Sequence, residues 1–225
     1  MEYISVAIDG PAGAGKSSVA KKVAKDLDFI YVDTGAMYRS VALYAIRNNI
    51  SPSDEIAIKE KIDDIDITIK YIDGVQHIYL NGVDVSEDIR TPQVSMGASD
   101  VAKIGIVREK LVSIQRNMAK IANIIMDGRD ICTTVLPDAQ IKLFLTASVD
   151  ARAKRRYDEM IQKGMECEYE EIKKDIIARD KNDSERKISP LKKADDAKLL
   201  DTSDMNFDEV VDTVKNEIKE HGYVL

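Results

Sequence analysis

One stretch constrains the fold of this chain more than any other: "VAIDGPAGAGKSSVAKKVAKDL", Val6–Leu27. A short β-rich apolar run leads into Gly10–Ser17, which fits the pattern G-x-x-x-x-G-K-[ST], and an amphipathic helix follows over Ser18–Leu27. The glycines let backbone N–H groups turn inward around an anion, and the helix adds its positive N-terminal end. In this setting Lys16 reaches the β- and γ-phosphates of a nucleotide, and the Ser17 hydroxyl ligates Mg²⁺. The context favours a P-loop that binds ATP or GTP over a merely solvated glycine-rich turn.

Length and composition are those of an ordinary globular chain, and they restrict its partners. The 225 residues suffice for one sizeable domain, or for a domain with an inserted lobe. No apolar run reaches the ~20 residues of a membrane span, and the N-terminus lacks the segments of a signal peptide. The net charge of -7 disfavours a protein that coats nucleic acid. Two distant cysteines, Cys132 and Cys167, and only two histidines predict reduced thiols in a cytoplasmic protein without a zinc site.

The rest of the chain alternates between strand-like and helix-like segments, which predicts an α/β fold with a parallel sheet covered by helices. The expected strands are Tyr3–Ile8, Phe29–Val32, Asn123–Met126, Ile141–Leu145 and Lys198–Leu200. Beyond the first helix, the expected helices are Ala36–Asn48, Asp100–Ala119, Val149–Lys163, Tyr169–Asp180 and Phe207–Glu220.

Two segments interrupt this alternation. Residues from about Asp63 to Pro92 alternate like strands and carry two turn signals, Asp73-Gly74 and Asn81-Gly82, so we expect an inserted antiparallel meander. The stretch "ARDKNDSERKISP", residues 178–190, is dense in charge. It is typical of a solvated surface loop, and the alternative is a lid that closes over phosphates.

Acidic and basic residues follow two of the expected strands. Asp33 and Thr34 can cap the next helix, and Arg39, about one turn further on, could reach a second phosphate group. Asp127 follows a hydrophobic run, as in a Walker B motif, and can act on Mg²⁺ through water. Taken alone, Arg39 could equally be a surface residue, and the neighbouring residues 129 and 130 could form a local ion pair.

Six motifs together are more specific than the P-loop. The chain carries "IDGPAGAGKSS", "VDTGAMYR", "VREKLVSIQR", "DGRDI", "LPDA" and "ARDKNDSERKISPL", in this order. With them the chain resembles the bacterial cytidylate kinases, which are nucleoside monophosphate kinases, over essentially its full length. The resemblance implies one P-loop kinase domain over residues 1–225, with a core of 1–62 and 93–225, an inserted antiparallel β lobe of about 63–92 and a mobile lid of about 180–190. The implied core is a five-stranded parallel sheet flanked by helices.

The resemblance also implies the roles of individual residues. The donor site would hold the ATP phosphates with Gly10, Pro11, Ala12, Gly13, Ala14, Gly15, Lys16, Ser17 and Ser18, and Ser17 would ligate Mg²⁺. The positions that match the family's cytosine-reading residues are Thr34, Ser99, Arg108 and Asp130. The positions that match its phosphate-holding arginines are Arg39, Arg129 and Arg186, while Arg179, Asp183 and Tyr38 match positions near the ribose. The catalytic charges would come from Lys16, Arg129, Arg179 and Arg186.

The implied reaction is direct in-line transfer of a phosphoryl group from ATP to CMP or dCMP, giving ADP and CDP or dCDP. Cytosine offers an amino donor and two acceptors, which suits a carboxylate together with arginine and serine side chains. Two positions depart from the family pattern: Cys132 stands where a glycine is common, and Thr34 stands where a serine is common. The resemblance further implies a monomer whose partners are small nucleotides, with neither nucleic acid nor a membrane among them.

Three other functions remain open at the level of the sequence. One is a kinase for another acceptor such as AMP, UMP or shikimate, which the meander and the set Ser99, Arg108 and Asp130 disfavour. Another is a nucleotide-dependent switch, but the chain lacks the GTPase motifs D-x-x-G and N-K-x-D. The last is a nucleic-acid-binding ATPase, which three phenylalanines, no tryptophan and the acidic charge disfavour.

Overall fold

The computed structural model describes residues 3–72 and 74–222, and the chain divides into two compact units. The first unit comprises Met1–Tyr31 and Ala122–Leu225, and the second comprises Val32–Ile121. Among the described residues, no helix is both long enough and apolar enough to span a membrane.

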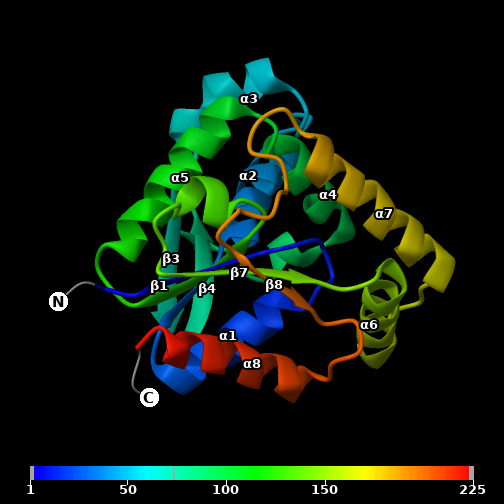
Figure 1. The fold of residues 1–225 in the computed structure, drawn as a ribbon. Helices are drawn as coiled ribbons and strands as arrows, with labels where there is room; N and C mark the ends of the chain where they lie inside the picture. Colours follow the sequence, from blue (N-terminus) through cyan, green and yellow to red (C-terminus); the bar gives the residue numbers. More distant parts are fainter. Residues whose placement is uncertain (1–2, 73, 223–225) are drawn as a thin grey trace. The chain divides into compact units, whose positions relative to one another are not determined.

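The predicted parallel sheet is built mainly from the first unit, which includes only the first two residues of β2 (Figure 1). Its strands, in the spatial order β2-β6-β1-β7-β8, are Ile30–Asp33, Ile124–Gly128, Ser5–Asp9, Ile141–Thr146 and Lys198–Asp201. The pairs β1–β6, β1–β7 and β7–β8 are parallel, and the β1–β6 register places Ile8 opposite Asp127. Every residue of β1 and β6 is buried, as expected for central strands that are covered on both faces.

Four helices accompany this sheet: α1 (Lys16–Leu27), α6 (Val149–Gln162), α7 (Tyr169–Glu185) and α8 (Phe207–Glu220). Helices α1 and α8 lie side by side against the sheet, and α6 packs against α7 (Figure 1). The core consists of strand residues such as Ile8 and Leu143 together with Val23 of α1 and Val214 of α8. Helix α8 has the predicted bounds, and Asn206 and Glu209 form a capping box that fixes its start.

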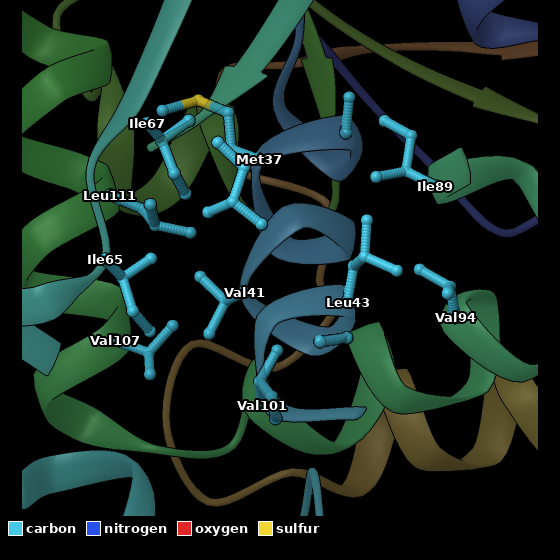
Figure 2. Close-up of a cluster of buried hydrophobic side chains, with 14 of the residues drawn as sticks. Met37, Val41, Leu43, Ile65, Ile67, Ile89, Val94, Val101, Val107 and Leu111 are labelled. Atoms are coloured by element: carbon cyan, nitrogen blue, oxygen red, sulfur yellow. The ribbon is translucent and has the colours of Figure 1, made fainter. Parts of the chain in front are cut away.

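The second unit combines a small antiparallel sheet with helices. The sheet has the order β3-β4-β5, with strands Ile67–Ile72, Val75–Leu80 and Val83–Asp84. The helices are α2 (Thr34–Arg47), α3 (Glu55–Lys61), α4 (Pro92–Val101) and α5 (Gly105–Ala119). Their buried side chains form a separate core around Met37 and Val41 of α2, which Leu111 of α5 completes (Figure 2).

The antiparallel meander therefore occurs where the sequence predicts it. At the second turn both Asn81 and Gly82 have positive φ angles, as a two-residue hairpin turn of this type requires. At the first turn Gly74 has φ +75°, and Asp73 lies outside the described residues.

In the second unit the predicted helices differ from the structure for identifiable reasons. The single helix expected over Asp100–Ala119 is two helices, α4 and α5, because Ile104 adopts an extended conformation between them. Helix α4 begins at Pro92, where Thr91 caps the backbone N–H of Val94. Helix α3, which was not predicted, is capped by Asp54.

The charged stretch 178–190 also differs from its expected form. Helix α7 continues to Glu185, five residues beyond its predicted end, so most of this stretch is helical and not a loop. Its buried face includes Ile172, Ile176 and Asp183, which explains why the helix persists through a polar sequence.

Candidate active site

The P-loop connects β1 to α1 in a backbone conformation that only glycine adopts readily. Gly10 and Gly15 have φ angles of +148° and +84°. A Cβ atom on Gly10 would lie 1.9 Å from the carbonyl oxygen of Leu145, so the start of the loop is packed directly on β7. Helix α1 begins at Lys16, immediately after the loop, and the N–H groups of its first turn are available to an anion. Pro11, Ala12 and Ala14 are buried, and Gly13 and Ser18 are exposed.

Lys16 is buried next to the loop, and its electrostatic setting is unusual. Only 5% of the residue is exposed, and its Nζ donates a hydrogen bond of 2.7 Å to the carbonyl oxygen of Pro11. Burial, followed by the positive charge of Arg129, lowers the pKa of Lys16 from 10.5 to about 7, against the opposing effect of Asp127. An anion placed in the loop would favour the charged amine.

Ser17 and Asp127 come together at the end of β6, although 110 positions separate them in sequence. The Ser17 hydroxyl donates to Oδ2 of Asp127 at 2.8 Å, and the Tyr31 hydroxyl donates to Oδ1 at 2.7 Å. Oxygen donors of this kind, a hydroxyl beside a carboxylate at the N-terminus of a phosphate-binding helix, fit Mg²⁺. The predicted Walker-B position of Asp127 is therefore next to the predicted magnesium ligand.

A second group of charges in this unit joins the loop after β6 to α7. Nε of Arg129 lies 2.6 Å from Oδ2 of Asp183, and Nη2 of Arg186 lies 3.2 Å from Oδ1 of Asp130. The alternative that residues 129 and 130 form a local ion pair is wrong, because each pairs with a residue more than 50 positions away. Asp130, Asp183 and Arg186 are buried, and these pairs satisfy their charges.

The charges of this cluster influence one another strongly. Burial raises the pKa of Asp183, but the charge and hydrogen bond of Arg129 and the charges of Arg179 and Arg186 outweigh it, so the pKa lies below its ordinary value of 3.8. Burial lowers the pKa of Arg129, but the charge and hydrogen bond of Asp183 and the charges of Asp127 and Asp180 together outweigh it, so the pKa lies above its ordinary value. The positive charge of Arg179 also contributes to the lowered pKa of Lys16. The predicted catalytic residues thus form one electrostatically coupled group in the first unit.

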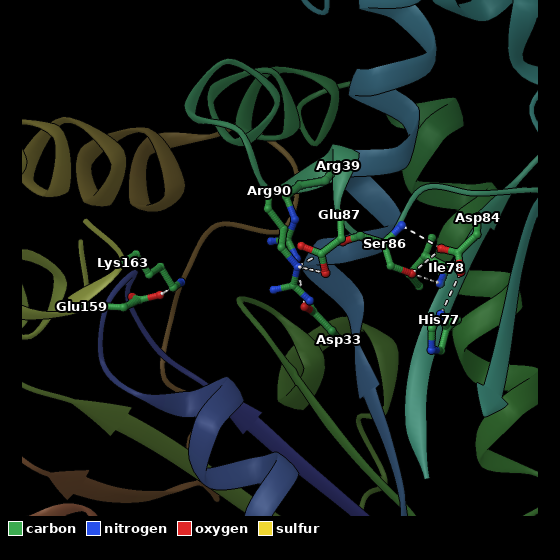
Figure 3. A network of polar contacts seen from close by, with 10 residues as sticks. All are labelled: Asp33, Arg39, His77, Ile78, Asp84, Ser86, Glu87, Arg90, Glu159 and Lys163. Carbon is green, nitrogen blue, oxygen red and sulfur yellow. Dashed lines mark hydrogen bonds and ion pairs between the residues drawn. The ribbon is translucent and has the colours of Figure 1, made fainter. Parts of the chain in front are cut away.

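In the second unit, the start of α2 holds three of the predicted residues. Asp33 caps the helix by accepting from the backbone N–H of Ala36 at 2.9 Å, as predicted, while Thr34 is buried in its first turn. The other carboxylate oxygen of Asp33 lies 2.8 Å from Nη2 of Arg39, which points toward it in Figure 3. Both side chains of this pair are largely buried, and Nε of Arg39 is buried without a hydrogen-bond partner among the described residues.

Ser99 and Arg108 lie on α4 and α5, and both helices pack against α2. Arg108 is only 4% exposed, and its guanidinium carbon lies 5.8 Å from the centroid of the Tyr38 ring, within range of a cation–π contact. Ser99 is also buried, and among the described residues no group hydrogen-bonds its Oγ. A buried hydroxyl without a partner calls for an explanation, and a bound ligand would supply one.

The four predicted cytosine-reading residues are thus distributed over both units. Thr34, Ser99 and Arg108 belong to the second unit, whereas Asp130 belongs to the first.

Arg152 is a functional candidate that the sequence reasoning missed. The residue is only 4% exposed. Its Nη1 donates to the carbonyl oxygen of Ala12 in the P-loop at 2.9 Å, and its Nε donates to the carbonyl oxygen of Ala147 at 2.9 Å. Its remaining nitrogen lies 2.7 Å from Oδ2 of Asp180 on α7. The sequence offers no signal that separates Arg152 from its exposed neighbour Arg156. Tyr31 was missed as well, because its hydroxyl reaches Asp127 on the neighbouring strand β6, 96 positions away in the sequence.

Comparisons of the sequence with known proteins agree on one family. The model of the family described as "Cytidylate kinase" matches residues 6–220. A cytidylate kinase of Caldicellulosiruptor bescii is 49% identical, covering 97% of this chain and 100% of that protein. A cytidylate kinase of Lactobacillus johnsonii is 54% identical, covering 92% of this chain and 90% of that protein. A crystal structure of a protein from Eubacterium ventriosum shares the fold, with a TM-score of 0.54 at 15% identity, covering 96% of this chain and 98% of that one.

Proposed function

The chain belongs to the cytidylate kinase family, and we propose that it transfers the γ-phosphoryl group of ATP to CMP or dCMP, giving ADP and CDP or dCDP. Family membership makes it a phosphotransferase and favours this activity over a nucleotide switch or a nucleic-acid-binding ATPase. The proposal that ATP is the phosphoryl donor rests on the arrangement of the P-loop, buried Lys16 and the Ser17–Asp127 pair.

At the donor end, the loop Gly10–Ser18 holds the phosphates of ATP, and Lys16 places its charge beside them. Ser17 and, through water, Asp127 would hold Mg²⁺, which would neutralise charge on the phosphate oxygens. Arg152 stabilises the loop by donating a hydrogen bond to the carbonyl oxygen of Ala12.

At the acceptor end, Arg108 and Ser99 donate to the N3 and O2 acceptors of cytosine, and Thr34 adds a hydroxyl. Asp130 accepts from the amino group, which uracil lacks. The burial of Arg108 and the unbonded Oγ of Ser99 support these roles, because a buried polar group gains most from a matching ligand.

The arginines supply positive charge during transfer. Arg39, Arg129 and Arg186 hold the CMP phosphate and the transferring group, while Arg179 and Asp183, with Tyr38, bind near the ribose. Phosphoryl transfer has a loose transition state with charge spread over several oxygens, so positioned cations provide most of the catalysis. Since residues 180–190 belong to the end of α7 and the segment after it, we propose that they act as a lid that excludes water.

We also propose that the enzyme works as a monomer in the cytoplasm, with small nucleotides as its partners. Its two cysteines are both free thiols, one of them buried, which suits a reducing compartment. Light scattering during size-exclusion chromatography tests the monomer directly.

The function is tested by ADP release with ATP and Mg²⁺ in parallel reactions with CMP, dCMP, UMP, AMP and no acceptor. Fast release with CMP and dCMP alone is the expected result. Release that favours UMP or AMP would keep the kinase and overturn the cytosine assignments. Equal slow release in every reaction would overturn the proposed function.

The acceptor assignments are tested with two variants. Arg108→Met and Asp130→Ala should each raise the KM for CMP more than the KM for ATP. Arg108→Met removes a charge that no accessible pH can neutralise. Arg116→Met, an exposed arginine on the same helix, is the matched control and should leave both KM values unchanged. A rise confined to the KM for ATP would show that the substituted residue does not belong to the acceptor site.

A further inference from the structure

Asp9 is a buried carboxylate to which the mechanism above gives no role. It is the last residue of β1, immediately before the P-loop, and none of its surface is exposed. Its Oδ1 accepts a hydrogen bond of 2.8 Å from the backbone N–H of Ile131, and its Oδ2 accepts one of 2.8 Å from the N–H of Cys132. Both oxygens are therefore used to hold two consecutive amides of a distant segment.

These amides begin the π-helical turn Ile131–Val135, which follows β6. The first N–H groups of a helical turn have no acceptor within it and need one from elsewhere. Asp130, at the N-cap position, provides no side-chain cap, so Asp9 supplies it from the adjacent strand. The direction of the chain immediately after Arg129 and Asp130 is set by this contact.

We propose that Asp9 is a positioning residue that holds the turn after β6 and thereby presents Arg129 and Asp130 to the acceptor nucleotide. This inference rests on the proposed function, because it assigns those two residues to CMP. The residue that positions the acceptor-binding side chains then lies at the start of the donor loop, because Asp9 directly precedes Gly10.

The charge of Asp9 matters for this role. Three titratable groups act on it or respond to it: Asp130, Cys132 and Lys16. Burial and then Asp130 raise its pKa, while the two backbone hydrogen bonds lower it, and the resulting pKa is about 6. Above this pH both oxygens accept, whereas protonation converts one of them into a donor that faces an N–H group.

The test is the substitution Asp9→Asn, which keeps the shape of the side chain but leaves one acceptor oxygen. At saturating ATP and Mg²⁺, kcat/KM for CMP should fall roughly 10- to 100-fold at pH 8, as expected for displaced catalytic groups. The KM for ATP, measured at saturating CMP, should change less. Cys132→Ala is the comparison variant: it removes a thiol that also hydrogen-bonds Asp9 but keeps the backbone N–H that Asp9 holds, so kcat/KM for CMP should fall far less.

A pH series separates positioning from a general loss of stability. The ratio of wild-type to Asp9→Asn activity should be largest at pH 8 and should shrink below pH 6, because protonated Asp9 resembles asparagine. A constant ratio between pH 5 and 8, or an effect confined to the KM for ATP, would overturn the inference.

An NMR measurement on the unaltered protein covers the case in which the variant does not fold. The amide resonances of Ile131 and Cys132 should titrate together with a midpoint near the pKa of Asp9, and amides that do not respond would overturn the inference. Wild-type protein that releases no ADP with CMP would overturn the proposed function instead, so the two failures are distinguishable.

Discussion

Binding of ATP to this protein should take up a proton, and Lys16 is the group that takes it. In the free protein the pKa of Lys16 is lowered from 10.5 to about 7, first by burial and then by Arg129. This difference corresponds to roughly 5 kcal/mol in favour of the neutral amine. A triphosphate in the loop supplies the negative charge that Lys16 lacks, so its pKa returns toward the ordinary value. Since the bound state holds more protons than the free state, raising the pH above 7 weakens ATP binding.

The expected size of the effect follows from the pKa. At pH 8 about nine-tenths of the free protein carries neutral Lys16, so ATP binding should take up about 0.9 proton. At pH 6 the uptake by Lys16 should be close to zero. Isothermal titration calorimetry with Mg²⁺ and ATP, without acceptor, in buffers of different ionisation enthalpy gives this number directly. In the free protein the pKa of Asp9, about 6, keeps that carboxylate ionised at pH 8.

Two variants on α1 make the measurement specific. Lys16→Arg keeps a cation that does not deprotonate, so proton uptake should disappear. Lys25→Arg, an exposed position in the last turn of the helix, should leave the uptake unchanged. Wild-type uptake near zero at pH 8, or full uptake in Lys16→Arg, would refute the reasoning.

Two further predictions concern the contacts that support the site. Arg152→Met should lower the free energy of unfolding by about 3 kcal/mol, because Asp180 and the Ala12 carbonyl lose their partner, and it should raise the KM for ATP more than that for CMP. Urea unfolding beside the exposed control Arg156→Met tests this, and equal stability of the two variants would contradict it. Because Arg129 helps to lower the pKa of Asp183, this carboxylate contributes stability above its ordinary pKa of 3.8 that is lost as the pH falls. Wild type should therefore lose more stability than Asp183→Asn between pH 6 and 3, and parallel unfolding curves would argue against it.

The sequence predicts parts of the first unit well, where its signals are local. A buried strand, a glycine-rich turn and an amphipathic helix follow one another in Val6–Leu27, and the structure has β1, the P-loop and α1 in that order. The predicted bounds of helix α8 also match the structure, and its capping box is formed within four residues of sequence. The motif positions identify the family, and the comparisons confirm it.

The errors occur where a longer-range contact decides the local structure. Helix α7 passes its predicted end because Ile176 and Asp183 are buried, and burial overrides a polar, charged sequence. The break between α4 and α5 at Ile104 is marked in the sequence only by the adjacent Gly105, yet it separates the helices that carry Ser99 and Arg108. Propensity alone cannot locate such a break, because the buried Ile104 side chain is part of the core.

The sequence by itself determined the family, the P-loop and the kinds of side chain available for phosphoryl transfer, because these depend on residue types at short spacings. Only the tertiary structure decided which of these side chains meet. Ser17 contacts Asp127, Arg129 pairs with Asp183, and Arg152 supports Ala12, over separations of 54 to 140 positions. The lowered pKa of Lys16 is a tertiary property too, since burial and charges from distant segments produce it. Electrostatic interactions act through space, so no local pattern in the sequence can specify them.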